Sequence, residues 1–300
     1  PRPLSTWLGS SGGLWSNAAN WDVLPTGVNN VSSVSIPSGS GPVVYDATAG
    51  ATTIQSLAVA GDLAINATGL SFSSLAVNGG TLSGTGSLVV TGGFQQSGGV
   101  ISGFNAVSIN QPTGDLSING GMIRAAGIDG ITLNASAGNL LLTNSTLDVS
   151  PAGVGQSAIT LDGLTSVQLS GTALKAPGGL ITLRAGSGSL SPLQIAGGSL
   201  LDATALSGTG GVVKLLGSTV TIDSANISTS GVDTGGSITA QAVGTVSLGA
   251  LSINSSRLIA DPPAAVGGTI NLLGDTISVT GGSGGSLLSV AGATGGSLNI

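Results

Sequence analysis

The sequence predicts an all-β protein, a right-handed parallel β-helix with three short strands in each coil. Three observations indicate this class. Segments of three to five residues alternate β-branched or Leu residues with small polar ones, as in "TINL" and "TISV". These segments recur in groups of three along the chain. Gly and Asn separate them, and Gly alone accounts for 53 of the 300 residues.

The repeat is clearest from about residue 131 onward. Triplets such as "AITL", "VQLS" and "ALKA", or "TINL", "TISV" and "LLSV", follow one another, with "SITAQ", "TVSL" and "RLIA" between them. One apolar residue of each first strand aligns, at intervals that are irregular but bounded: Ile131, Ile159, Ile181, Val213, Ile238, Ile270 and Leu298. The variable spacing predicts that insertions collect at one corner of the coil.

A single coil of this kind cannot bury its apolar edge. Stacking coils about 4.8 Å apart pairs each strand with its equivalents above and below and builds a continuous core. The crossover preference predicts the right-handed sense. Corners between strands need positive φ, which Gly and Asn supply, and Gly-Gly pairs precede several first strands.

The first 45 residues differ from the rest, because they hold every Trp and Tyr of the chain: Trp7, Trp15, Trp21 and Tyr45. We expect residues 1–45 to form an aromatic N-terminal cap or first coil, since the end of a β-helix exposes apolar core. The alternative is a platform on which sugar rings stack. Residues 46–300 are expected to form the shaft, with about 11 to 13 coils in all, a length of roughly 50 to 60 Å, and a continuation or stacking beyond residue 300.

The composition excludes many activities. Cys and His are absent, which rules out thiol nucleophiles, disulfides, Cys/His zinc sites and Ser-His-Asp triads. Six cations in 300 residues make no nucleic-acid footprint. A mean hydropathy of +0.50 argues against disorder. We expect no cofactor and no metal, and no enzyme activity.

One charged group stands out, at the third strand of successive coils. Asp148, Lys175 and Asp202 each follow a Leu and lie at equal intervals along the chain, so stacking brings them together. We interpret them as a surface ion-pair ladder. The alternative is a sugar-cleaving site, which needs converging carboxylates but lacks a second cation and aromatic subsites here. Calcium-binding nonapeptides and a regular threonine array for ice binding are not evident.

The opening "W-x-G…G-x-WSNAANW…P…V-x-I-P" resembles the leader of many bacterial surface and autotransporter-like proteins. The body, "GTLSGTGSLVVTGGFQQSGGVISG" followed by "GG-x-I-x-L…I-x-V…GG" coils, resembles filamentous-haemagglutinin-like exoproteins of two-partner secretion systems and is similar to autotransporter passenger domains. The Asn-Pro signature of the secretion domain, NPNG, does not occur. The resemblance implies export through an outer-membrane secretion partner, an extracellular or cell-surface location, and roles in adhesion, aggregation or biofilm matrix.

We therefore expect a secreted bacterial surface protein that acts as an adhesin shaft or as a component of an extracellular filament. Its partner would be another copy of the chain, joined end to end or laterally, or a host or matrix glycan. A glycan would contact the Trp-rich end or the variable loops at 151–157, 202–211 and 260–268. The runner-up is a β-helical protein that binds or degrades polysaccharide.

Overall fold

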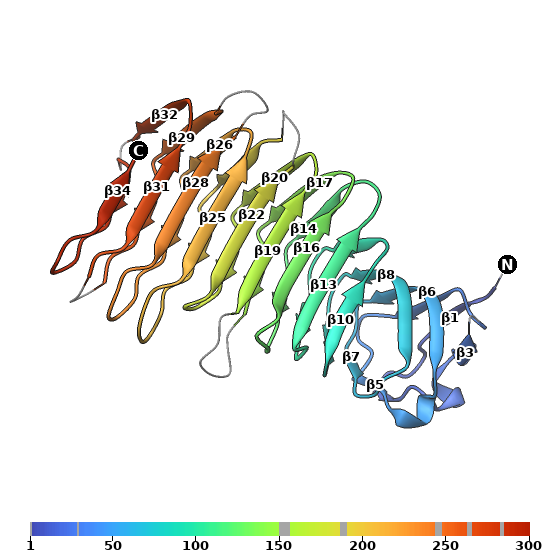
Figure 1. Cartoon of the computed structure of the whole chain (residues 1–300). Helices are drawn as coiled ribbons and strands as arrows, with labels where there is room; N and C mark the ends of the chain where they lie inside the picture. Colours follow the sequence, from blue (N-terminus) through green and yellow to red (C-terminus); the bar gives the residue numbers. More distant parts are fainter. Residues whose placement is uncertain are drawn as a thin grey trace.

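The computed structural model describes residues 2–28, 30–149, 157–186, 191–243, 248–262, 266–282 and 285–300. It confirms a three-sided parallel β-helix: strands of successive coils stack into three sheets that run along a rod (Figure 1). Every pair of named strands that the structure describes is parallel, as the stacking of coils requires. The right-handed sense stays a prediction.

Three sheets, named sheets 1 to 3, make up the walls. Sheet 1 runs through β1 (Leu4–Thr6), β4 (Ser33–Ile36), β6 (Thr52–Val59), β8 (Leu70–Val77), β11 (Phe94–Gln96), β14 (Leu116–Asn119), β17 (Asn139–Thr143), β20 (Ser166–Ser170), β23 (Leu193–Ala196), β26 (Val220–Asp223), β29 (Ala250–Asn254) and β32 (Thr276–Thr280), with β3 (Gly27–Val28) paired to β6. Sheet 2 runs through β2 (Gly13–Leu14), β5 (Val43–Tyr45), β7 (Leu63–Ile65), β9 (Thr81–Gly84), β12 (Val100–Ser102), β15 (Met122–Arg124), β18 (Thr146–Asp148), β21 (Ala173–Lys175), β24 (Leu200–Asp202), β27 (Asn226–Ser228), β30 (Arg257–Ile259) and β33 (Leu287–Ser289). Sheet 3 runs through β10 (Ser87–Val90), β13 (Ala106–Gln111), β16 (Gly130–Ala135), β19 (Ala158–Gly163), β22 (Leu180–Ala185), β25 (Val212–Gly217), β28 (Ser237–Ala242), β31 (Thr269–Leu273) and β34 (Ser297–Asn299). Two short 3₁₀ helices, η1 (Ala18–Asn20) and η2 (Ala47–Ala49), lie near the N-terminal end.

The predicted register of sheet 3 is confirmed at every aligned position. Ile131 pairs with Ile159, and the column continues through Ile181, Val213, Ile238, Ile270 and Leu298. Insertions between coils therefore leave the strand register intact and are absorbed outside the strands.

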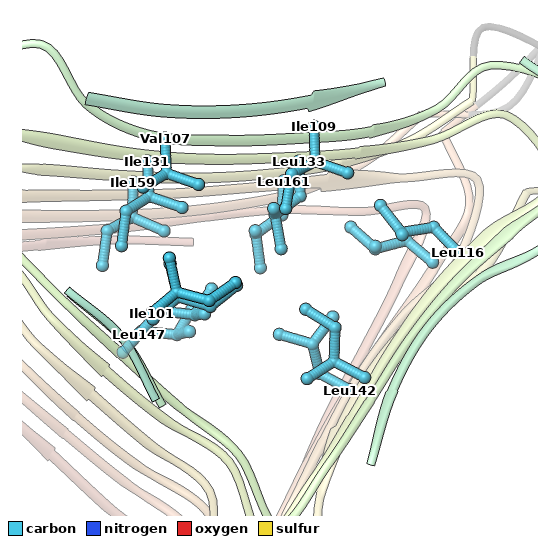
Figure 2. Close-up of a cluster of buried hydrophobic side chains, with 14 of the residues drawn as sticks. Ile101, Val107, Ile109, Leu116, Ile131, Leu133, Leu142, Leu147, Ile159 and Leu161 are labelled. Atoms are coloured by element: carbon cyan, nitrogen blue, oxygen red, sulfur yellow. The ribbon is translucent and has the colours of Figure 1, made fainter. Parts of the chain in front are cut away.

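Alternation along each strand builds the core. In β16, Ile131 and Leu133 are buried while Thr132 between them faces outward. Figure 2 shows the result: Val107, Ile131 and Ile159 stack on one wall of the tube, with Leu142 and Leu147 reaching in from the other two. In these coils sheets 1 and 3 each contribute two apolar columns, and sheet 2 contributes one, to a core that runs along the axis.

The N-terminal coils have a different cross-section. Sheet 3 begins only at β10, whereas β6 and β8 have eight residues each and turn the corner within one strand. In β6 the amides of both Gln55 and Ser56 donate to the carbonyl of Ser32, so one extra residue bends the strand. The strands within residues 1–45 belong to the same ladders as the shaft, because β1 and β4 lead sheet 1 and β2 and β5 lead sheet 2.

Two details differ from the sequence analysis. In the triplet that opens with "SITAQ", the middle strand is β29 (Ala250–Asn254) rather than "TVSL" at 245–248, most of which falls outside the described residues. The Gly-Gly pairs at 210–211, 235–236 and 267–268 do not adopt positive φ. They are needed because backbone approaches too closely for a side chain: a Cβ on Gly235 would lie 2.0 Å from the Ala260 carbonyl oxygen. Positive φ does occur at the Asn-Gly-Gly corners, with 57° at Gly80 and 84° at Gly121.

Candidate functional site

The aromatic residues form one buried cluster at the N-terminal end. Trp7, Trp15 and Tyr45 are at most 1% exposed, and Trp21 is 5% exposed. Their rings meet edge to face: Trp21 lies 4.9 Å from Trp7 and 4.7 Å from Trp15, and Trp15 lies 5.4 Å from Tyr45, between ring centroids.

Each indole N–H of this cluster is satisfied by a nearby backbone carbonyl. Trp15 Nε1 donates to Pro25 O at 3.0 Å, Trp21 Nε1 to Trp15 O at 2.7 Å, and Trp7 Nε1 to Gly9 O at 2.6 Å. Burial raises the pKa of the Tyr45 phenol above its ordinary value, against hydrogen bonding with Thr52, which lowers it. Because no ring face is open to solvent, these four residues pack the end of the core and offer no platform for a sugar in this conformation.

The predicted charge ladder lies on the outward row of sheet 2. Register places Asp148 beside Lys175 and Lys175 beside Asp202, on three successive strands. The row also holds Arg124, which pairs in register with Asp148. Arg124 donates to Asp148 Oδ2 from both Nε, at 3.0 Å, and Nη2, at 2.6 Å. The row therefore alternates in sign over four coils.

Sequence reasoning missed Arg124 because it looked only for the constant interval that separates Asp148, Lys175 and Asp202. Arg124 precedes Asp148 by 24 residues, so only the structural register reveals it. Asp202 accepts a hydrogen bond from the backbone N–H of Thr204 at 3.0 Å. The two carboxylates are separated by the Lys175 strand instead of facing a common cleft. The ion pair formed on the described part of this row is Arg124–Asp148, so register brings the three predicted residues together but the ion-pair ladder itself stays a prediction.

A second ion pair, also missed in the sequence, lies at the corner that leads from sheet 3 to sheet 1. Arg184 on β22 and Asp162 on β19 are register neighbours and form a bidentate pair, with Nε to Oδ1 at 2.8 Å and Nη2 to Oδ2 at 3.0 Å. Hydrogen bonding and the charge of Asp162 raise the pKa of the Arg184 guanidinium above its ordinary value. The pair lines a depression of about 440 Å³.

Another depression, of about 390 Å³, lies over β6, β8 and β11 of sheet 1 and is lined mainly by small side chains and by Gln95 and Gln111. Gln111 Oε1 accepts a hydrogen bond from the Phe94 N–H at 2.9 Å and so bridges to the next sheet.

The described residues contain no cluster of three or more carboxylates that could hold a metal ion. Within the same residues, no helix is both long and apolar enough to cross a membrane.

The predicted variable loops are described only in part. Residues 151–156 and 263–265 lie outside the described residues. The loop at 202–211 contains Leu206, which is 91% exposed, and its end at Thr209 bridges to Thr234, which in turn bridges to Val266. Stacked backbone thus extends from the sheets into the base of these loops.

No family model, curated protein or solved structure matches this chain.

Proposed function

We propose that this protein is an extracellular shaft, a β-helical rod of an adhesin or filament at a bacterial surface, that associates laterally with further copies of itself. The rod supports this role because its core is continuous along the axis, and the two depressions described above are open to the surface. Secretion, surface location and an outer-membrane secretion partner rest on the resemblance of the repeats to filamentous-haemagglutinin-like and autotransporter proteins.

The observation that carries the proposal is the outward face of sheet 1. Its central row crosses twelve strands without a charged residue: Thr6, Ser35, Ala58, Ala76, Gln95, Ser117, Leu141, Gln168, Gln194, Thr221, Ser252 and Ser278. Burying hydroxyl and amide groups costs little when they find hydrogen-bond partners, whereas burying a charge is expensive. A second copy has the same strand spacing, so polar side chains on two such faces can match over many coils.

The other two faces carry more charge than sheet 1, where the one charged residue in the described strands is Asp223, beside the central row. The outward row of sheet 2 contains Arg124, Asp148, Lys175 and Asp202 on consecutive strands. The outward rows of sheet 3 contain Asp162, Arg184 and Lys214. Joining like faces there would bring ions close to ions of the same sign or require their desolvation.

Electron microscopy and light scattering of the purified chain test the proposal. The native protein should form laterally joined bundles as concentration rises. The double variant Gln168→Lys, Gln194→Lys places two charges in the neutral row and should remain as single rods. Adding two lysines to sheet 2, as Ala173→Lys with Asn226→Lys, matches the change in net charge and should leave bundling intact. Single native rods at all concentrations, or equal bundling of both variants, would contradict the proposal.

A further inference from the structure

The corner depression beside Arg184 is built from three successive coils. Its lining comes from the ends of β16, β19 and β22 and the turns that follow: Asn134, Ala135, Ser136, Asp162, Gly163, Leu164, Arg184 and Gly186. The floor consists of small residues. Gly163 must be Gly because a Cβ there would lie 2.1 Å from the Ser166 carbonyl oxygen. The close backbone approach at Gly163 therefore fixes this part of the floor.

The polar side of the depression is held in place by hydrogen bonds. Asn134 Nδ2 donates to Asn110 Oδ1 and to Ser136 Oγ, both at 3.0 Å, and Ser136 Oγ donates to Asn110 Oδ1 at 2.6 Å. The Asp162–Arg184 pair continues the same outward row. Although the Arg184 side chain is 61% exposed, its guanidinium is oriented by two hydrogen bonds to one carboxylate.

Hydrogen-bonding capacity is left over on this row. Arg184 has five N–H groups and uses two of them on Asp162, which leaves Nη1 and part of Nη2 to donate. Asn134 uses its amide hydrogens and keeps its carbonyl oxygen as an acceptor. Leu164, which also lines the depression, is 49% exposed and offers an apolar surface. Donors, an acceptor and an apolar wall thus converge on one small volume.

We infer that this corner is a binding site for an uncharged glycan built of hexopyranose units. Neighbouring hydroxyls of a sugar ring both donate and accept, so one can accept from the Arg184 guanidinium while another donates to the carbonyl oxygen of Asn134. The C–H face of a pyranose can pack on Leu164. Two strand spacings of about 4.8 Å separate Asn134 from Arg184 along the axis, which accommodates about two sugar rings. This site goes beyond the proposed association of rods, because it lies on sheet 3 and not on the face of sheet 1.

The charge balance decides against other ligands. An anionic sugar gains little from Arg184, since Asp162 already neutralises the guanidinium and would repel a second carboxylate. A cation would find one carboxylate, already engaged by Arg184. The described lining holds no aromatic residue, which predicts weak binding, with a Kd in the range of about 0.1 to 10 mM.

Saturation-transfer NMR and titration with cellohexaose, mannohexaose, maltohexaose and a galactohexaose test the inference, with hexagalacturonate as the acidic comparison. At least one neutral oligosaccharide should bind, and Arg184→Ala should weaken it by about tenfold or more. Arg184→Lys keeps the charge but loses the planar fork, so it should weaken binding comparably. Arg124→Ala is the matched control, because it removes the other ion pair, on sheet 2, and should leave binding unchanged.

Circular dichroism of each variant checks that the rod is intact. Binding that disappears with Arg184 and survives loss of Arg124 supports the site. Failure of every neutral oligosaccharide to bind, preference for hexagalacturonate, or affinity unchanged in Arg184→Ala would overturn it. Each of these results leaves the bundling experiment unaffected, so the two proposals fail separately.

Discussion

Substituting Gly235 by Ala tests the claim that Gly-Gly pairs permit close backbone approach at the loop corner. Gly235 lies between the loop and β28, where its N–H donates to Val266 O at 2.9 Å. An added Cβ would lie 2.0 Å from the carbonyl oxygen of Ala260 and 2.4 Å from the nitrogen of Gly268. Such contacts below 3.0 Å are essentially never seen, so the two coils must move apart by about 1 Å at this corner.

The expected cost follows from what that movement disrupts. It lengthens the hydrogen bond between the coils, from Gly235 N to Val266 O. The added Cβ also lies close to both atoms of the bond from Gly268 N to Ala260 O, within the next coil, and so disrupts it directly; both bonds are 2.9 Å in the native chain. Two such bonds contribute about 1 to 3 kcal/mol, and overpacking adds a strain of about 1 to 3 kcal/mol. We therefore expect Gly235→Ala to lower the free energy of unfolding by about 2 to 6 kcal/mol.

Gly198→Ala is the matched control. Gly198 has φ of +79°, but a Cβ there meets nothing within 4 Å, so its cost is only the backbone preference of about 1 to 2 kcal/mol. Urea denaturation gives the global values. Native-state hydrogen exchange follows the amides of Gly236 and Ser237, because unfolding of a solenoid can be local. If Gly235→Ala costs no more than Gly198→Ala, the close-approach explanation is wrong.

Three further predictions concern the core and its end. Trp15→Ala should lower the free energy of unfolding, measured by denaturation, by about 3 to 5 kcal/mol, because the ring is fully buried and its N–H donates to Pro25 O. A change below about 1 kcal/mol would show that the aromatic cluster is not part of the cooperative core. Since the folded state raises the pKa of Tyr45, the stability from its neutral phenol is fully present below about pH 10 and is lost as pH rises through the folded-state pKa. Tyr45 is the one tyrosine in the chain, so ultraviolet absorbance follows its ionisation directly, and Tyr45→Phe should show less loss of stability at alkaline pH than the native chain. Leu161→Ala should lower the free energy of unfolding by about 2 to 5 kcal/mol, because Leu161 is fully buried. Leu164 lies three residues away and is half exposed, so Leu164→Ala should change the free energy of unfolding by no more than about 0.5 kcal/mol. Equal shifts in Tm for the two variants would contradict the assigned burial.

The fold could be predicted because every coil repeats the same apolar strands, whatever the length of the insertion between them. Aligning Ile131, Ile159 and Ile181 needs only alternation within each strand, since a slip of one residue would turn the apolar side chains outward. Turn chemistry was harder to predict. Asn144, Ser224 and Ser255 adopt φ between 48° and 53° at corners where Gly serves in other coils, and propensity does not distinguish such a Ser from one within a strand.

The candidate sites were less predictable, because surface rows are defined by register and not by constant spacing. Arg124 stands 24 residues from Asp148, and Arg184 stands 22 from Asp162. A search at the longer interval that separates Asp148 from Lys175 finds neither pair. The aromatic cluster shows the opposite difficulty. Trp7, Trp15 and Trp21 were visible as a group, but whether their faces meet solvent depends on how the first coils fold over one another.

A solenoid core separates surface chemistry from stability in a way that a globular fold does not. Each outward row rests on the same buried columns, so the residues of one row can change while the register of the core remains fixed. Here the row on sheet 1 is neutral, the row on sheet 2 alternates in sign, and the corner beside sheet 3 combines an ion pair with Asn134 and Leu164. Association between rods and recognition of a glycan would then use different faces of one shaft. Because the corner at Arg184 leads from sheet 3 to sheet 1, it borders the face proposed to join the rods. Titrating single and bundled rods with the same oligosaccharide would therefore show whether association leaves the site accessible; if it does, a lateral array would display this weak site many times over, the condition under which millimolar contacts give strong adhesion.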